Sequence, residues 1–544
     1  MSAPQHDFTS AAESLPELGR VVEISGAHAN VSLDARMLAM LASSDAMQPA
    51  SIGSHVKLLL GGNWVVAQVR NLRLAEADGD LILGAIDLVG EGKDEGGQLA
   101  DFRRGVSSLP MPGCRVHPTT ADDLASIFAT DERANIAIGS VLGGTARRDG
   151  TRLRAALYVD NLLSRHFAIL GSTGTGKSST TALILHRICA ASPNAHILMI
   201  DPHGEYAEAF RTTGAIFDVA NLAIPYWLMN LEEHAEVFVT AQGPERGPDT
   251  DLLAKCLLAA RLKNRCAEGI SRLTADSPIP YLLSDLSNII SQEMGKLDRG
   301  GATVAPYLRL KGRIDEVRND PRYGFMFSGM LVGDSMVPFL SRMLRLGEGD
   351  QPIAIVDLSA VPSEITPVVV ALLARLVFDH ALWSRGDDLR PVLLVCEEAH
   401  RYIPQESWSP ARRVLERIAK EGRKYGVSLG LISQRPSDLA EGVLSQCGTI
   451  VAMRLNNERD QMHVRSAVPE GARGLIDSIP ALRNREAVVV GEGVSIPFRV
   501  AFDALRPDQL PASRDPSFAA MWRTRAAEPA RLERTIRRWR AQGR

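Results

Sequence analysis

The chain of 544 residues lacks the patterns that mark several classes of protein. Aromatic residues make up only 5% of it, and its six cysteines are scattered without a single CxxC pair. A zinc ribbon and a thioredoxin-like redox site both need such pairs, so neither is expected. Isolated cysteines are typical of reduced thiols in the cytosol, and we therefore expect a cytoplasmic protein.

The chain also has no excess of basic residues and no long apolar run. The formal net charge is -3 at pH 7, so a nucleic-acid site must come from local clusters or from charge concentrated by assembly. The first residues, MSAPQHDFTSAAESLPE, lack the basic start and apolar run of a secretory signal. We also identify no stretch of about 18 apolar residues, and predict neither a transmembrane helix nor a membrane partner.

Changes of pattern divide the chain into four parts. Residues 1–15 are expected to form a flexible tail. Residues 16–152 contain short alternating strands around turns such as Gly61-Gly62, which predicts a small β-barrel. In residues 153–505 strands alternate with helices, which predicts a doubly wound α/β domain. Residues 506–544 are expected to form a basic, helical tail.

Six runs in the α/β part are apolar along their whole length, as parallel strands covered on both faces should be. They are HFAILG, HILMID, PIAIVDL, PVLLVCE, VSLGLIS and GTIVAMRL. Between about residues 249 and 349 the strands stop, and three stretches have helical patterns: DLLAKCLLAARLKNRCAEG, YLLSDLSNIISQEM and MVPFLSRMLRLG. They predict a helical insertion. In the tail, Leu532, Ile536 and Trp539 share one face of a helix expected after Pro529. Whether the arginines of that helix face solvent or contact nucleic acid or a partner stays open.

A glycine-rich loop follows the first of these runs and precedes a helical pattern. Gly171–Ser178 fits GxxxxGK(S/T), in which Gly174 and Gly176 let successive N–H groups point at one anion. The helix start adds its positive end, Lys177 is expected to reach the β- and γ-phosphates, and the Ser178 hydroxyl is expected to bind Mg²⁺. We predict that the nucleotide contacts Gly171, Ser172, Thr173, Gly174, Thr175, Gly176, Lys177, Ser178 and Ser179.

Acidic residues end two of the other predicted strands. Hydrolysis needs a carboxylate for the metal and a group that orients the attacking water. Glu397 and Glu398 end PVLLVC, and we assign Glu397 to Mg²⁺ through its water shell and Glu398 to the water. Because Asp is the usual acid at the metal position, which glutamate does which job stays open. Asp201 and Glu205 follow HILMI and are expected at the same sheet edge.

Two further polar residues flank the run VSLGLIS. Gln434 directly follows it and is a candidate γ-phosphate sensor, with a hydrogen-bonded turn as the less favoured alternative. Arg423 precedes it in IAKEGRKYGVS. In one subunit Arg423 would be a solvated charge, whereas in a ring it could reach the neighbour's nucleotide as an arginine finger. Spacing alone does not choose between these interpretations.

Four stretches occur in a characteristic order: LLSRHFAILGSTGTGKS, ILMIDPHGEY, LLVCEEAHRYIP and IAKEGRKYGVSLGLISQRPSDL. Together they resemble the HerA family of hexameric DNA-translocating ATPases, relatives of the FtsK motors. GRVVEISGAHANVSLD resembles the small β-barrel of that family. The resemblance extends from Gly19 to about Leu505 and implies a RecA-like P-loop NTPase core that uses ATP and Mg²⁺.

The resemblance also implies roles and partners. It assigns Glu398 as catalytic acid, Gln434 as sensor and Arg423 as arginine finger. Asp201, Glu205 and Arg165 match positions beside the nucleotide. It further implies a homo-hexameric ring that acts on double-stranded DNA with a nuclease or a Sir2-like effector, in DNA end processing or anti-phage defence.

Two alternatives to a motor remain. The ring might only bind ATP and serve as a scaffold that assembles and regulates an effector enzyme. A metabolic kinase is less favoured, because no acceptor site can be identified in the sequence. Hydrolysis of ATP that is stimulated by DNA distinguishes a motor from a scaffold.

Overall fold

The computed structural model describes residues 15–42, 50–75, 80–129, 134–143, 152–296, 303–328, 333–347, 349, 351–512, 518–523 and 529–540. The predicted flexible tail, apart from Leu15, lies outside these residues. The chain forms two compact units. Unit 1 consists of Met1–Ala191 and Gly430–Arg506, and unit 2 consists of Ser192–Leu429 and Pro507–Arg544.

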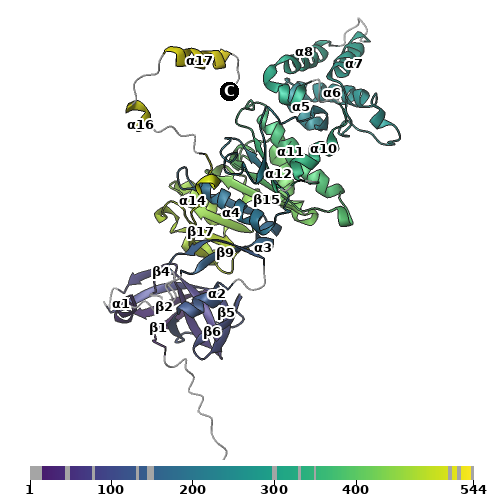
Figure 1. Cartoon of the computed structure of the whole chain (residues 1–544). Helices are drawn as coiled ribbons and strands as arrows, with labels where there is room; N and C mark the ends of the chain where they lie inside the picture. Colours follow the sequence, from purple (N-terminus) through teal and green to yellow (C-terminus); the bar gives the residue numbers. More distant parts are fainter. Residues whose placement is uncertain are drawn as a thin grey trace, which may run out of the picture. The chain divides into compact units, whose positions relative to one another are not determined.

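The first sheet of unit 1 is the predicted β-barrel (Figure 1). Its strands are β1 (Gly19–Ser25), β2 (His28–Asp34), β3 (His55–Leu60), β4 (Asn63–Leu74), β5 (Leu81–Glu95), β6 (Gln98–Arg104) and β7 (Arg115–Pro118). The order β2-β1-β7-β3-β4-β5 closes on itself because β2 also pairs with β5, and β6 extends β5. Gly61 and Gly62 have φ of 55° and 87°, as a two-residue hairpin turn requires. The helices in this part of the chain are α1 (Ala35–Ala42) and α2 (Ala121–Ile127).

The second sheet of unit 1 surrounds the strand before the glycine-rich loop. Its order is β15 (Val427–Ser433), β10 (Phe167–Leu170), β16 (Thr449–Met453), β17 (Glu486–Gly491), β18 (Phe498–Phe502), β8 (Asn135–Val141) and β9 (Arg154–Tyr158). β10 pairs in parallel with β15 and β16, and the pairings from β16 to β9 are antiparallel. β8 therefore belongs to this sheet and not to the barrel, so the boundary between the two sheets lies before β8 and not at residue 152. The alternation of apolar and polar residues predicts that a segment is a strand, but it does not predict which strand the segment pairs with.

Helices α3 (Val159–Ser164), α4 (Lys177–Ala191), α13 (Glu441–Leu444), α14 (Glu458–Ala467) and α15 (Arg473–Ile476) complete unit 1.

Unit 2 has its own parallel strands. Their order is β12 (Gly214–Phe217), β13 (Ile353–Asp357), β11 (Ile197–Asp201) and β14 (Val392–Cys396). β15 starts in unit 2 and enters unit 1 at Gly430. The six apolar runs of the sequence are β10, β11, β13, β14, β15 and β16, and every residue in these strands is buried. The prediction of six buried strands with parallel neighbours is confirmed, and with the barrel it confirms the α/β fold class.

The predicted helical insertion is present in unit 2. Its helices, with the one that precedes them, are α5 (Leu231–Phe238), α6 (Arg246–Arg261), α7 (Leu283–Gly295), α8 (Ala305–Asn319), α9 (Gly324–Phe327) and α10 (Met336–Leu344). The sequence patterns predicted α6, α7 and α10 but not α8. That helix is largely polar and buries only Leu310, Ile314 and Val317, so its apolar stripe is narrow.

Helix α11 (Thr366–Trp383) bears on the prediction that the chain has no transmembrane helix. It is the one helix in the described part of the chain with the length and mean hydropathy, 1.4, of a membrane span, although 67% of it is buried inside the protein. Arg375 and Asp379 interrupt its apolar residues. α11 packs against α12 (Pro410–Glu421), α5 and β14, and that packing accounts for its apolar surface.

Two helices follow the sheets at the end of the chain, α16 (Phe518–Arg523) and α17 (Pro529–Arg540). α17 is the helix predicted after Pro529. Its Leu532 and Trp539 side chains are 62% and 74% exposed, so the apolar residues of the tail face solvent.

Arg375 connects α11 to α5 within unit 2. Its Nε and Nη2 lie 2.8 and 2.9 Å from the two carboxylate oxygens of Glu233, and its Nη1 lies 3.0 Å from Asp379. Nη2 also donates to the Leu228 carbonyl at 2.6 Å. The Glu233 side chain is only 1% exposed, and it caps α5 at Asn230. Arg375 therefore neutralises a buried carboxylate that cannot turn toward water.

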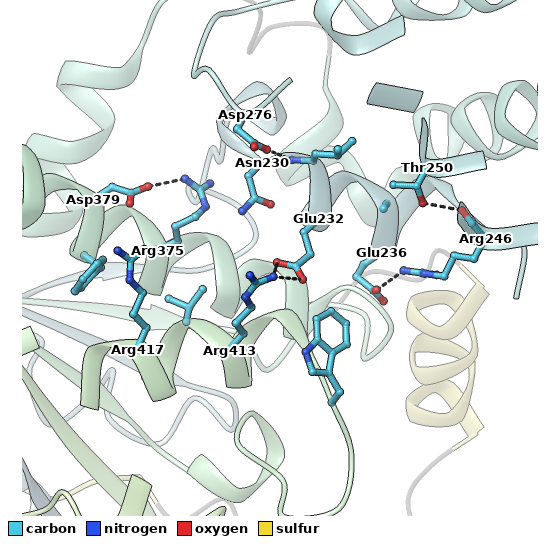
Figure 2. Close-up of a pocket in the computed structure, with 15 residues that line it drawn as sticks. Asn230, Glu232, Glu236, Arg246, Thr250, Asp276, Arg375, Asp379, Arg413 and Arg417 are labelled. Atoms are coloured by element: carbon cyan, nitrogen blue, oxygen red, sulfur yellow. Dashed lines mark hydrogen bonds and ion pairs between the residues drawn. The ribbon is translucent and has the colours of Figure 1, made fainter. Parts of the chain in front are cut away.

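A pocket of about 530 Å³ lies beside this cluster, between helices of the insertion and the helices α11 and α12 (Figure 2). Its arginines pair across it: Arg413 contacts Glu232 at 3.1 Å, and Arg246 contacts Glu236. The Arg417 guanidinium lies 4.6 Å from the ring centre of Phe378. No residue predicted to bind or hydrolyse the nucleotide lines this pocket.

Replacing Arg375 should destabilise unit 2 strongly. Arg375→Ala leaves Glu233 buried without its cation, and we expect a loss of about 3–5 kcal/mol in the free energy of unfolding, measured by urea unfolding at pH 7. Arg417→Ala, which removes a half-exposed guanidinium from the same pocket, is the matched control and should cost less than about 1 kcal/mol. Equal losses for the two variants would contradict the role assigned to Arg375.

Candidate nucleotide-binding site

The glycine-rich loop of unit 1 has the backbone that phosphate binding requires. It connects the carboxyl end of β10 to α4, and Gly174 and Gly176 have φ of 78° and 93°. A Cβ on Gly176 would lie 3.1 Å from the Cγ of Arg485, and one on Gly171 would lie 2.8 Å from the Cβ of Met453. Larger residues are thus disfavoured by conformation and by space, so the loop can present its N–H groups together.

Hydrogen bonds from neighbouring strands hold the loop in place. Gly171 N donates to Ser433 O at 3.2 Å, and Ser172 N donates to Arg454 O at 2.9 Å. Arg485 N donates to Thr175 O at 2.9 Å. The shape of the loop is therefore set by β15 and by the segments after β16 and before β17, not by the loop sequence alone.

Gln434 lies beside the loop, as a γ-phosphate sensor must. Thr173 Oγ1 donates to Gln434 Oε1 at 2.5 Å, and both residues belong to unit 1. Lys177 and Ser178 open α4, a helix of 15 residues, and Lys177 is 8% exposed. Unit 1 thus brings the loop, the first turn of α4 and Gln434 together.

Arg165 lies at the other end of β10. It precedes Phe167, whereas the loop follows Leu170. Its Nη1 contacts Glu492 at 3.0 Å, and its carbonyl accepts a hydrogen bond from Gly448 N at 2.7 Å. The length of β10 therefore separates Arg165 from the loop of its own chain, and its contact with the nucleotide stays a prediction.

In unit 2, Asp201 ends β11 and holds the turn that follows. Its Oδ1 accepts from the N–H groups of His203 and Gly204 at 3.1 and 2.8 Å, and its Oδ2 accepts from Tyr206 N at 3.0 Å. Burial, with a smaller contribution from Asp357 on the adjacent strand, raises the pKa of Asp201 to about 6, although the three N–H donors act in the opposite direction. These contacts make Asp201 a residue that shapes the turn.

Glu205 lies within this turn and is partly exposed. Its carbonyl accepts a hydrogen bond from Ala512 N at 2.8 Å, so the segment after η13 (Pro507–Gln509) is fastened to the same turn.

Glu397 and Glu398 follow β14, as predicted, and differ sharply in their surroundings. Glu397 is 2% exposed, and the Tyr206 hydroxyl donates to its Oε2 at 2.8 Å. Glu398 is 6% exposed, and its Oε2 lies 3.3 Å from His400 Nδ1. Its φ of 51° is left-handed, a conformation that costs a non-glycine residue about 1 kcal/mol or more. The sharp turn at Glu398 gives the two adjacent acids separate partners.

Arg423 lies in η9 (Gly422–Tyr425) and is exposed, as is Lys424. A finger that acts on a neighbouring subunit must be exposed in the isolated chain, but a solvated surface arginine would be as well. Its role stays a prediction.

Two residues of the site escaped the sequence analysis. Arg485 has a left-handed φ of 63° and contacts the loop through its backbone, but nothing in the sequence ALRNREAVVV distinguishes it. Tyr206 ends the stretch DPHGEY, and nothing in that pattern marks its hydroxyl as a partner of Glu397. Its hydroxyl contact with Glu397 depends on the pairing of β11 with β14, which brings Ile200 next to Cys396.

Known proteins resemble this chain over most of its length. The family model for the central domain of helicase HerA matches residues 136–377. The chain is 28% identical over 440 residues to the DNA double-strand break repair helicase HerA of Pyrococcus furiosus, a match that covers 75% of each chain. It is also 28% identical over 504 residues to a probable HerA of Methanocaldococcus jannaschii, covering 85% of this chain and 92% of that one. The chain is thus similar in sequence to helicase HerA.

The HerA model extends from β8 into α11, so it includes the glycine-rich loop and Asp201 but not Glu397, Glu398 or Arg423. A solved structure, VirB4 of Thermoanaerobacter pseudethanolicus, is 17% identical with a TM-score of 0.49 and covers 70% of the HerA-like chain and 99% of its own.

The buried carboxyl of Asp201 gives a prediction for pH. Its ordinary pKa is 3.8 and its pKa in the fold is about 6, so between these values the folded state binds a proton that the unfolded state lacks. Its contribution to stability therefore falls as pH rises from about 4 to about 6 and is constant above that range. Between pH 5 and pH 7, the wild type should lose about 1 kcal/mol more than Asp201→Asn.

Urea unfolding of both proteins in metal-free buffer at the two pH values measures this difference. Each protein serves as its own reference, so a constant cost of the substitution cancels. Parallel losses in the two proteins would show that Asp201 is not protonated in this range.

Proposed function

We propose that this HerA-like chain is an ATP-driven double-stranded DNA translocase or helicase. It works as a homo-hexameric ring in the cytoplasm, with a nuclease or another effector such as a Sir2-like protein, in DNA end processing or anti-phage defence. The observation that carries the proposal is the phosphate-binding backbone at Gly171–Gly176, next to the start of α4, in a HerA-like chain.

The loop fits a nucleoside triphosphate with Mg²⁺. Its left-handed glycines and the start of α4 offer N–H donors to phosphate, and Lys177 offers a cation for the terminal phosphates. The Ser178 hydroxyl and, through water, the Glu397 carboxylate are oxygen donors of the kind that Mg²⁺ prefers. When bound, the metal neutralises charge that develops on the phosphates.

Residues of the chain provide the remaining steps. Glu398 orients and polarises the attacking water, and His400 Nδ1 lies 3.3 Å from its Oε2. Gln434, which contacts Thr173, transmits the presence of the γ-phosphate to the loop. Asp201 and Glu205 shape the turn after β11, Arg423 acts on nucleotide bound to a neighbouring subunit, and Arg165 is a further basic residue that contacts the nucleotide.

A ring explains how a chain of net charge -3 handles DNA. A few arginines on each subunit, repeated around a channel, produce a positive surface that contacts phosphates without reading bases. Binding should then be independent of sequence and sensitive to salt. The relatives are named as DNA double-strand break repair helicases, which supports DNA as the substrate.

Substitutions in the two units test the ATPase. Lys177→Ala removes the phosphate contact and should lower ATP turnover roughly 100-fold or more. Glu398→Gln keeps the size of the side chain but loses the base and should cost roughly 100-fold as well, with nucleotide binding retained. Turnover is measured by phosphate release with and without duplex DNA, which should stimulate the wild type.

Glu406→Gln, at an exposed acid after the same turn, is the control and should hydrolyse ATP normally. Normal turnover by Lys177→Ala would refute the site. Turnover by the wild type that does not respond to DNA would favour the scaffold over the motor.

Mixed rings test the arginine finger. An arginine supplied in trans contributes roughly 10³-fold or more to turnover. Arg423→Ala and Lys177→Ala subunits, each inactive alone, should therefore regain roughly a quarter of the wild-type rate when mixed in equal amounts, because the intact loop of one then meets the intact arginine of the other. Lys424→Ala, at the adjacent exposed lysine, is the control and should be active alone. Mixed rings as inactive as the two pure variants would exclude a finger supplied in trans by Arg423.

A further inference from the structure

The Tyr206 side chain connects the turn after β11 to the acid after β14. It is 0% exposed, and its hydroxyl donates to Glu397 Oε2 at 2.8 Å in the buried interior of unit 2. Glu397 itself is 2% exposed, so the contact is shielded from water on both sides. A hydrogen bond to a shielded carboxylate is stronger than one at the surface, and it fixes the rotation of the carboxylate plane.

The turn that carries Tyr206 is held rigidly at several points. Asp201 accepts the Tyr206 N–H at 3.0 Å, and Glu205 O accepts from Ala512 N at 2.8 Å. Gly204 has a φ of 66°, and a Cβ at this position would lie 2.5 Å from Asp357 Oδ2. The position of the Tyr206 ring is therefore determined by the strand ends and leaves the hydroxyl little freedom to follow a moving Glu397.

The backbone fixes Glu397 from the other side. Glu397 N donates to Ile200 O at 3.1 Å, one residue before Asp201. The acid and the tyrosine are thus anchored to the same end of β11, and the hydroxyl holds one oxygen of the carboxylate.

We propose that Tyr206 is a positioning residue that orients the Glu397 carboxylate toward the water shell of the nucleotide-bound metal. This inference rests on the proposed function, because it assumes that Glu397 holds the metal. It predicts that loss of one buried oxygen, without any loss of charge, weakens metal binding and leaves binding of the metal-free nucleotide unchanged.

The chain provides a matched control in Tyr402. Its side chain is 1% exposed, and its hydroxyl makes no hydrogen bond within the part of unit 2 that the structure describes. Tyr206→Phe and Tyr402→Phe each remove one buried hydroxyl near the same strand ends. Only the first should change metal binding if hydrogen bonding to Glu397 is what matters.

Binding of Mn²⁺ to the full-length protein loaded with ADP, followed by electron paramagnetic resonance, tests the proposal without relying on turnover. Tyr206→Phe should weaken Mn²⁺ binding about 10-fold, which is typical when a partner of a metal ligand is lost. Tyr402→Phe should bind Mn²⁺ as the wild type does. All three proteins should bind ADP equally in the absence of metal.

Glu397→Asp provides a second variant that leaves the tyrosine in place. It keeps the charge but withdraws the carboxylate from the hydroxyl, and should weaken Mn²⁺ binding similarly. Adding Tyr206→Phe to Glu397→Asp should then have no further effect.

These measurements distinguish failure of the role of Tyr206 from failure of the proposed function. If the wild type binds Mn²⁺ and ADP but Tyr206→Phe binds Mn²⁺ equally well, the positioning role is wrong and the proposed function stands. Unchanged Mn²⁺ binding by Glu397→Asp would overturn the positioning role in the same way. If the wild type binds no ADP, the proposed function fails and the inference fails with it.

Discussion

Burial of carboxylates at the ends of parallel strands is the constraint on which the chemistry of unit 2 depends. β13, β11 and β14 lead into Asp357, Asp201 and the pair Glu397–Glu398, and none of these four side chains is more than 9% exposed. A carboxylate removed from water is costly unless fixed donors or cations replace the lost solvation. The turn after β11 provides these donors: three N–H groups for Asp201 and one hydroxyl for Glu397.

The same constraint gives the two adjacent glutamates different environments. Glu397 continues the direction of β14 and contacts Tyr206, while the left-handed backbone at Glu398 turns the chain and leaves its carboxylate beside His400. Strain of this kind is maintained where surrounding structure enforces it, and it occurs often at functional sites. A metal-directed acid and a water-directed acid need such separate surroundings, which is why we assign them different roles.

The sequence predicted those parts of the fold whose physical cause is local. Strands β10, β11, β13, β14, β15 and β16 are buried on both faces, so their sequences are apolar throughout. The glycine-rich loop was identifiable because its left-handed positions demand glycine. The short strand β12 and the polar helix α8 carry weak periodic signals, and the apolar length of α11 was missed because Arg375 and Asp379 interrupt it.

Features that arise from tertiary packing were not predictable in this way. The assignment of β8 to the second sheet depends on its pairing with β18, and the contact of Arg485 with Thr175 depends on how β17 begins. Tyr206 meets Glu397 only because β11 and β14 are neighbours. The finger role of Arg423 depends on a neighbouring subunit and the role of Arg165 depends on a bound nucleotide, so both roles are still predictions.

The proposed function requires that hydrolysis of ATP moves this HerA-like protein along duplex DNA. Displacement of a fluorescent third strand from a triplex, placed at a distance from the DNA end, tests that movement most directly. The wild type should displace the third strand only when ATP and Mg²⁺ are present. The displacement should be delayed when the duplex between the DNA end and the triplex is lengthened. Rapid ATP hydrolysis without displacement of the third strand would contradict it.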